Sequence, residues 1–223
     1  MAVELITLET IKNSPLVKAV ITQADKSMGT LGYTEHGFRH ADLCAHISGN
    51  IMARLSFSVR QVELAAIGGY LHDIGNSISR TFHGVTGSLL AKSILEQAGV
   101  PFEEVIVVMA AIGNHEEEYG GPTSEIGAAT ILADKSDVHR SRVRNPDPAA
   151  FDIHDRVNYA AERSFLRVDG DNGTITLEID IDTTISPVME YFEIFLSRMI
   201  MCRKAAKFLN CKFGLIINNT ELM

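Results

Sequence analysis

The period of the apolar pattern changes once along this chain, and that change limits the folds open to it. Up to about residue 142, apolar side chains recur at three- and four-residue steps, as in amphipathic helices. Residues 145–148, Asn-Pro-Asp-Pro, then break the helical pattern. Beyond them, residues 174–182 alternate apolar and polar side chains, as in a half-buried strand. The sequence therefore predicts a helical first part and a second part that mixes strands and helices.

Consecutive helices are expected through the first part. They cover about residues 15–28, 36–57, 58–73, 83–98, 102–115 and 123–138. The second part is expected to hold a short helix, a hairpin, a long helix opened by Ser186-Pro187 and a last strand. These elements cover about residues 155–163, 165–168, 174–182, 186–210 and 213–218. We expect plain packing of the second part against the helices, with a cover over a pocket or a dimer surface as alternatives.

Composition and charge argue against several classes of protein. The net charge is −8 without a basic stripe, which disfavours general nucleic-acid binding but allows a small phosphorylated substrate in a locally cationic pocket. Three scattered cysteines, Cys44, Cys202 and Cys211, argue against a disulfide framework and for a reducing cytoplasm. The chain holds no run of about 18 apolar residues that predicts a membrane span. Met1 to Glu9 lacks the pattern of a signal peptide.

Histidines and aspartates at the ends of apolar helices predict a metal site. His72-Asp73 ends a helix of small residues, His40 lies on the inward face of its helix, and Asp134 ends a third apolar stretch. Two imidazoles and two carboxylates form the mixed donor set that suits Mn, Fe, Co, Ni or Zn. No cysteine belongs to the set, which disfavours a structural zinc. A chain of 223 residues buries a core without metal, so we expect the metal to be functional.

A second His-Asp pair, His154-Asp155, tests how much the dipeptide alone means. It lies in a polar stretch after the proline break, with no apolar helix leading into it. Asp155 is therefore interpreted as a helix-start residue. We expect His154 and Asp155 to lie outside the pocket.

The order and spacing of the first set resemble a known family. His40, then Leu71-His72-Asp73-Ile74-Gly75, then Ala133-Asp134 resemble the H…HD…D signature of the HD superfamily of metal-dependent phosphohydrolases, over residues 15–142. The resemblance implies a mainly α fold, with an HD-type helical bundle over residues 1–145. The expected hairpin, long helix and last strand predict a small α+β appendage over residues 146–223. It also implies that His40, His72, Asp73 and Asp134 bind a metal in the middle of the bundle.

Two further histidines bear on the number of metals. His83 and His115 occupy positions that resemble the extra ligands of two-metal HD enzymes, with Asp73 bridging the ions. The short turn at Gly99-Val100-Pro101 would place the start of one helix beside the end of the next, which brings these two histidines together independently of the family. The alternative is that His115 caps a helix and His83 is a surface loop residue. We expect two divalent ions, iron or manganese, with Co, Ni, Zn or Mg as alternatives.

The chain also departs from one branch of the family. The HD-GYP cyclic-dinucleotide phosphodiesterases carry a lysine where this chain has Asn76 and a histidine where it has Asn114. The Gly-Tyr-Pro motif is absent. These differences argue against cyclic-dinucleotide cleavage.

Asp73, His36 and Lys135 are the candidate catalytic residues. Asp73 could orient the attacking water as well as bridge the metals. His36 lies one helical turn before His40, so it contacts a phosphate or supports a ligand, or else it is a helix cap. Lys135 pairs with a phosphate or orients Asp134, or else it is a surface lysine. Arg140, Arg142 and Arg144 contact phosphate or serve as cations near a helix end.

The function expected from these residues is an enzymatic one. Metal-activated water would hydrolyse a small phosphorylated substrate such as a nucleotide. Two alternatives stay open, a mixed-valence di-iron oxygenase of the HD type and a non-catalytic module that binds a nucleotide and signals. A homodimer is a further partner option. Substrate identity depends on side chains around the metal core, which the signature does not specify.

Overall fold

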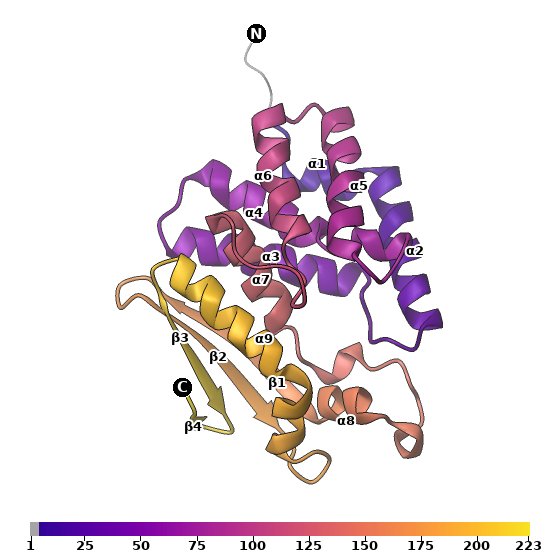
Figure 1. Ribbon diagram of the computed structural model, residues 1–223, viewed down its shortest axis with the longest axis vertical. Coiled ribbons are helices and arrows are strands. Elements are labelled where there is room, and N and C mark those ends of the chain that lie inside the picture. The colour runs from indigo at the N-terminus through magenta and orange to yellow at the C-terminus, as the bar shows by residue number, and fades with distance from the viewer. Residues whose placement is uncertain (1–4) are drawn as a thin grey trace.

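The computed structural model describes residues 5–223, and its first part is a bundle of helices (Figure 1). The helices are α1 (Leu8–Asn13), α2 (Pro15–Thr30), α3 (Phe38–Arg54), α4 (Val59–Leu71), α5 (His83–Ala98), α6 (Phe102–Gly113) and α7 (Glu125–Ser136). From Ile126 onward every residue of α7 is buried. A helix that is covered on all sides belongs to the interior of the fold, and α7 contacts α3, α4 and α6. Helix α7 therefore lies in the interior of the fold, between the other helices and the second part.

Capping residues explain where several helices begin and end. Ser58 and Gln61 form a reciprocal capping box that starts α4. The Ser124 hydroxyl accepts a hydrogen bond from the Gly127 N–H and starts α7, one residue after the expected Thr123. Gly99 ends α5 with a φ of 88°, a left-handed conformation that glycine adopts without a steric penalty.

The second part contains a small mixed sheet. Its elements are α8 (Ile153–Ala160), β1 (Ala161–Asp169), β2 (Thr174–Ile181), α9 (Val188–Phe208), β3 (Lys212–Ile217) and β4 (Thr220–Glu221). The strand order is β1-β2-β3-β4, and only β2 and β3 among these neighbours run parallel. Parallel neighbours need a crossover connection, and the long helix α9 supplies it.

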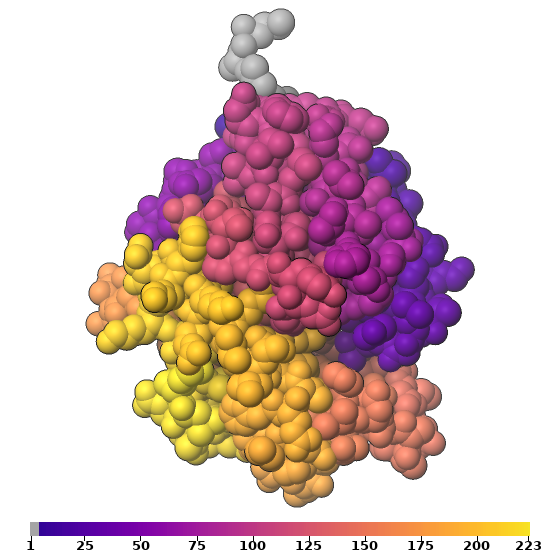
Figure 2. Space-filling view, in the orientation of Figure 1, coloured from indigo at the N-terminus to yellow at the C-terminus, as the bar shows by residue number. Residues whose placement is uncertain are grey.

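The α+β part packs against one end of the bundle through α9 and β1. Helix α9 contacts α7 on one side and β2 and β3 on the other, while β1 contacts α3 and α7. The space-filling view shows this part covering the lower end of the bundle across the visible face (Figure 2). Buried apolar residues of both parts, such as Ile131, Leu177 and Phe195, belong to one continuous core. The two parts thus share a single interior.

The mainly α architecture predicted from the apolar periodicity is confirmed. Each expected helix and strand is present, with ends that differ by a few residues. Strand β1 begins at Ala161 instead of Phe165, because its polar start, with an irregular register between Ala161 and Arg163, lacks the alternation that marks a strand. The short helix α1 and the strand β4 were not predicted. No helix within residues 5–223 is long and apolar enough to cross a membrane.

Candidate metal centre

Two glycines let the helix ends that carry the site approach one another. A Cβ atom on Gly69 would lie 2.6 Å from the Cys44 carbonyl oxygen, so α4 packs directly against α3 only with glycine there. A Cβ atom on Gly75 would lie 1.9 Å from the His83 carbonyl oxygen, so the turn after His72-Asp73 lies against the start of α5. These close contacts place His72-Asp73 between α3 and α5.

His40 and His72 form one half of a buried cluster. Their Nε2 atoms are 3.2 Å apart, and both side chains are almost fully buried. Asp73 Oδ2 lies 3.5 Å from His40 Nε2 and 3.4 Å from His72 Nε2. Asp134 Oδ1 lies 3.5 and 3.7 Å from the same two nitrogens. The four residues predicted to bind the first metal therefore converge on one point.

His83 and His115 form the other half. Their Nε2 atoms are 3.0 Å apart, and they lie 3.4 and 3.7 Å from Asp73 Oδ1. The carboxylate of Asp73 thus faces one imidazole pair with each oxygen. The proximity expected from the short turn between α5 and α6 is confirmed, and both rings point inward.

The hydrogen bond made by Nδ1 of each ring determines whether the Nε2 atom carries a hydrogen or a lone pair. His72, His83 and His115 each donate Nδ1–H to the carbonyl oxygen three residues earlier, at 2.8, 3.0 and 2.6 Å. His40 donates Nδ1–H to Asp137 Oδ2 at 2.7 Å. A carbonyl oxygen only accepts, so the neutral rings carry their hydrogen on Nδ1 and present a lone pair at Nε2.

The paired Nε2 atoms lie 3.2 and 3.0 Å apart, so each pair shares either one hydrogen or one metal ion. A divalent metal between two Nε2 atoms would replace the shared hydrogen as the partner of both nitrogens. A metal-binding histidine commonly donates its other ring hydrogen to a carbonyl or carboxylate, as all four rings do here. The buried His/Asp cluster is therefore chemically suited to binding metal. Cys44 Sγ, 3.7 Å from His40 Nε2, adds a thiol beside the first half.

The electrostatics of the cluster also favour a cation. Burial opposes the charged form of His72, but the Asp73 carboxylate outweighs it and raises the pKa of His72 to about 10. Burial likewise opposes ionisation of Asp73, yet the adjoining His72 keeps the pKa of Asp73 well below its usual range. Burial, reinforced by His115, lowers the pKa of His83 to about 3, so that ring stays neutral, with Arg80 Nη1 3.4 Å from its Nε2.

Lys135 is buried, not exposed. Its Nζ lies 2.6 Å from Asp134 Oδ2 and 3.1 Å from Glu117 Oε1. Burial lowers the pKa of Lys135, but the Asp134 and Glu117 carboxylates outweigh this effect and raise it, so the side chain stays charged. Of the interpretations open from the sequence, the structure favours the one in which Lys135 orients Asp134.

His36 lies beside the cluster, outside the ligand positions. Helix α3 begins at Phe38 with Gly37 as its N-cap, so His36 is not the cap. Its Nδ1 donates to the Thr34 carbonyl oxygen at 2.6 Å and its Nε2 accepts from Arg142 Nη2 at 3.3 Å. Burial, followed by the Arg142 charge, lowers the pKa of His36 well below its usual value. His36 is thus a neutral side chain 5.6 Å from the His40 ring, between centroids.

Asp137 and Glu116 position two of the histidine rings, and neither role was predicted from the sequence. Asp137 accepts the His40 hydrogen and also pairs with Arg39 at 2.8 Å. Glu116 Oε2 lies 3.0 Å from His83 Nδ1, while its Oε1 accepts from the Gly84 N–H at 2.7 Å. The position of Asp137, three residues after Asp134 at a helix end, was the available signal. Glu116 lies in a run of three glutamates that resembles an ordinary solvated segment.

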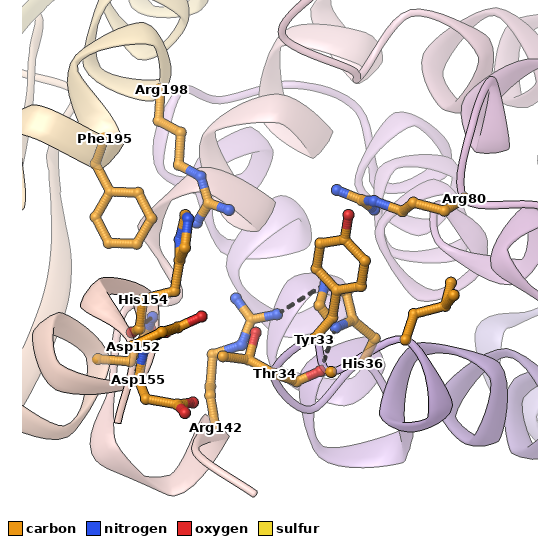
Figure 3. A pocket seen from close by; sticks show the side chains of 13 residues that line it. Tyr33, Thr34, His36, Arg80, Arg142, Asp152, His154, Asp155, Phe195 and Arg198 are labelled. Atoms are coloured by element: carbon orange, nitrogen blue, oxygen red, sulfur yellow. Dashed lines mark hydrogen bonds between the residues drawn. The ribbon is translucent and has the colours of Figure 1, made fainter. Parts of the chain in front are cut away.

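A cleft of about 380 Å³ lies beside the cluster (Figure 3). Its lining comes from both parts of the chain: Leu31, Gly32, Tyr33, Thr34, His36, Arg80, Arg142, Asp152, His154, Asp155, Asn158, Phe195 and Arg198. His154 and Asp155 lie outside the groups that could hold a metal, as predicted, but both line the adjoining cleft, where α8 contacts α9. The second part packs against the bundle through α9, and α8 and α9 also form one side of the cleft.

The three arginines after α7 have different surroundings. Arg142 is buried and lines the cleft, and it donates to the Asp137 and Glu35 carbonyl oxygens at 2.8 and 2.9 Å. Arg140 pairs with Glu162, and Arg144 pairs with Asp25. Only Arg142 of these three belongs to the cleft.

Comparison with known proteins identifies one relative without a described activity. No family model matches the chain. The chain is similar to an uncharacterized protein of Methanocaldococcus jannaschii, at 29% identity over 194 residues that cover 77% of this chain and 74% of the relative. That share of the chain is larger than the helical part alone, so the similarity includes residues of the second part as well.

Proposed function

We propose that this protein hydrolyses phosphate esters with two divalent metal ions bound in an HD-type helical bundle. The observation that carries the proposal is the position of the Asp73 carboxylate between two imidazole pairs, one facing each oxygen. A bridging carboxylate with histidines on both sides is the donor arrangement that a two-metal hydrolase needs. The resemblance to the HD signature agrees with this arrangement.

The ligands divide into two sets around Asp73. His40, His72, Asp134 and Asp73 Oδ2 would hold one ion, and His83, His115 and Asp73 Oδ1 the other. Imidazole and carboxylate donors suit iron or manganese, with Co, Ni, Zn and Mg as further candidates. When bound, such ions lower the pKa of water toward about 7 and neutralise charge on a phosphate group.

The remaining residues of the centre act on the ligands. Asp137 fixes the His40 ring through Nδ1, and Glu116 lies against the His83 ring on its outer side. Lys135 holds Asp134 Oδ2 and leaves Oδ1 facing the His40-His72 pair. Such contacts fix the orientation of a ligand and strengthen it as a donor.

The adjoining cleft supports a phosphorylated substrate over an uncharged one. Arg80, Arg142 and Arg198 line it together with His36 and His154, although the chain as a whole is acidic. Guanidinium groups match the geometry of phosphate oxygens, and clustered cations beside a metal attract anions. The neutral organic substrate of an oxygenase would form no ion pair with these arginines.

The test is a reconstitution experiment on the purified chain. Metal-free protein would be loaded with Mn²⁺, Fe²⁺, Co²⁺ or Ni²⁺ and assayed with phosphomonoesters, phosphodiesters and nucleotides, with and without oxygen. The proposal expects phosphate release that needs metal and is independent of oxygen. Oxygen-dependent substrate consumption would replace it with the di-iron oxygenase, and nucleotide binding without turnover would replace it with the signalling module.

A further inference from the structure

The cleft has two walls, and they come from the two parts of the chain. The segment before α3 and the arginines Arg80 and Arg142 form the wall next to the metal cluster. Helices α8 and α9 form the opposite wall, which carries His154, Phe195 and Arg198 (Figure 3). The Arg198, Arg142 and Arg80 side chains extend from different sides into the same space (Figure 3).

Arg198 contacts one carboxylate and one aromatic ring, and its donors stay free of hydrogen bonds among residues 5–223. Its Nε lies 3.2 Å from Glu117 Oε1, and its guanidinium carbon is 4.3 Å from the centroid of the Phe195 ring. Within residues 5–223, its Nη1 and Nη2 groups form no hydrogen bond. A guanidinium that is oriented from one side and free on the other is prepared for an anion, because little side-chain entropy remains to be lost on binding.

A chain of ion pairs connects Arg198 to the His/Asp cluster. Glu117 lies between Arg198 and Lys135, and Lys135 pairs with Asp134 at 2.6 Å. Arg198 therefore has a defined position relative to a metal ligand even though it lies on the second part.

Arg80 and the side chains of α8 complete the surroundings. Arg80 contacts Asn76 and His83 at 3.4 Å and has no carboxylate partner among the described residues. His154 is exposed in the cleft on the same wall as Arg198. The two acids of this wall are engaged locally, since Asp152 accepts from the Asp155 N–H at 2.8 Å and Asp155 accepts weakly from Asn145.

We propose that Arg198 and His154 bind a phosphate group of the substrate on the wall opposite Arg80. This inference rests on the proposed function and extends it, because the active site then includes residues of 146–223 that lie outside the HD signature. The second part is in that case a component of the substrate site and not only a cover.

The test compares variants of the metal-loaded protein in pairs. Arg198→Gln is paired with Arg203→Gln, an exposed arginine of the same helix, and His154→Ala with His46→Ala, an exposed histidine of α3. Binding of inorganic phosphate is measured by calorimetry, and KM and kcat are measured with a phosphomonoester that the wild type hydrolyses. Metal content and the circular dichroism spectrum serve as structural readouts. His154 is exposed, so its removal tests the inference without disturbing the core.

Arg198→Gln should weaken phosphate binding and raise KM by about tenfold to a hundredfold, with kcat changed less and metal content unchanged. His154→Ala should raise the Kd for phosphate and the KM by about threefold to tenfold, as expected for a weaker contact. Arg203→Gln and His46→Ala should match the wild type. Unchanged phosphate affinity and KM in both site variants would overturn the inference while leaving the hydrolase intact. Without turnover of any phosphate ester, a selective loss of phosphate binding in the site variants would still support it.

Discussion

The helical part and the α+β part differ in how many polar side chains they bury. Before residue 143, imidazoles, carboxylates, a lysine and an arginine are all buried around the ends of α3, α4 and α7. In residues 146–223, Asn158 and Ser186 are the only polar side chains that reach the same degree of burial, and the sheet interior is apolar. Buried charges are costly unless they are paired or bind metal. The buried polar side chains that could bind a metal therefore belong to the first part, and the interior of the second part is held together by apolar packing.

The largest effect should come from the residue shared by both halves of the cluster. Asp73→Ala should lower metal-dependent hydrolysis by on the order of a thousandfold or more and release metal, because both ions lose a ligand. Circular dichroism should stay close to wild type, since the core does not depend on the ion. Asp42→Ala, which removes an exposed carboxylate of α3, is the matched control and should leave hydrolysis and metal content unchanged. Undiminished turnover in Asp73→Ala with chelator present would rule out the mechanism.

A substitution in the sheet should instead lower the stability of the fold and leave the metal content unchanged. Leu177 is fully buried between strand neighbours, so Leu177→Ala should lower the free energy of unfolding by about 2–5 kcal/mol. Metal content of the folded protein should remain at the wild-type value. Urea unfolding and metal analysis on the same sample separate the two quantities. Loss of metal from a folded Leu177→Ala variant would mean that the two parts are less distinct than their buried residues indicate.

Lys135 lies where the two parts meet, so its removal should affect metal more than a surface lysine does. Lys135→Met deprives Asp134 of its ion pair and should weaken metal binding by about tenfold to a hundredfold. Lys92→Met removes an exposed lysine that pairs with Glu96 and should leave metal affinity unchanged. Competition with a chromogenic chelator measures both. Equal affinities in the two variants would remove Lys135 from the metal centre.

The smallest effect is expected for a surface ion pair of the sheet. A hydrogen bond from Arg167 lowers the pKa of Glu178 below its usual 4.5, so this pair stabilises the fold above that pH and loses its effect as the pH falls through the lowered pKa. Glu178→Gln should therefore cost less than about 1 kcal/mol at pH 7, and the difference should shrink toward zero in acid. Urea titrations between pH 3 and about pH 7 test this dependence. A difference in stability between wild type and Glu178→Gln that stays the same at every pH would contradict a stabilising role for the Glu178 charge.

The site residues that could be predicted are those placed by local sequence patterns. His40, His72, Asp73 and Asp134 stand at the ends or inward faces of apolar helices, so helical periodicity alone brings them near the interior. His83 and His115 follow from one short turn. These are relations within a helix or between sequential helices.

The remaining features depend on contacts between distant segments. His154 was assigned to the surface because its neighbours are polar, yet the packing of α8 places it in the cleft. Arg198 lies on a long amphipathic helix that gives no sign of a site, and its role depends on how α9 lies against α7. Such packing is set by tertiary contacts that no local pattern encodes.

The central claim, that Asp73 bridges two metal ions, is tested most directly by metal stoichiometry. The double variant His83→Ala, His115→Ala removes one imidazole pair and keeps His40, His72, Asp73 and Asp134. Metal content per chain would be measured after anaerobic loading with Mn²⁺ or Fe²⁺, alongside wild type and His46→Ala. The account predicts about two ions in wild type and His46→Ala and about one in the double variant. One ion per chain in all three proteins would contradict the two-metal centre and leave His83 and His115 as neighbours of a single site.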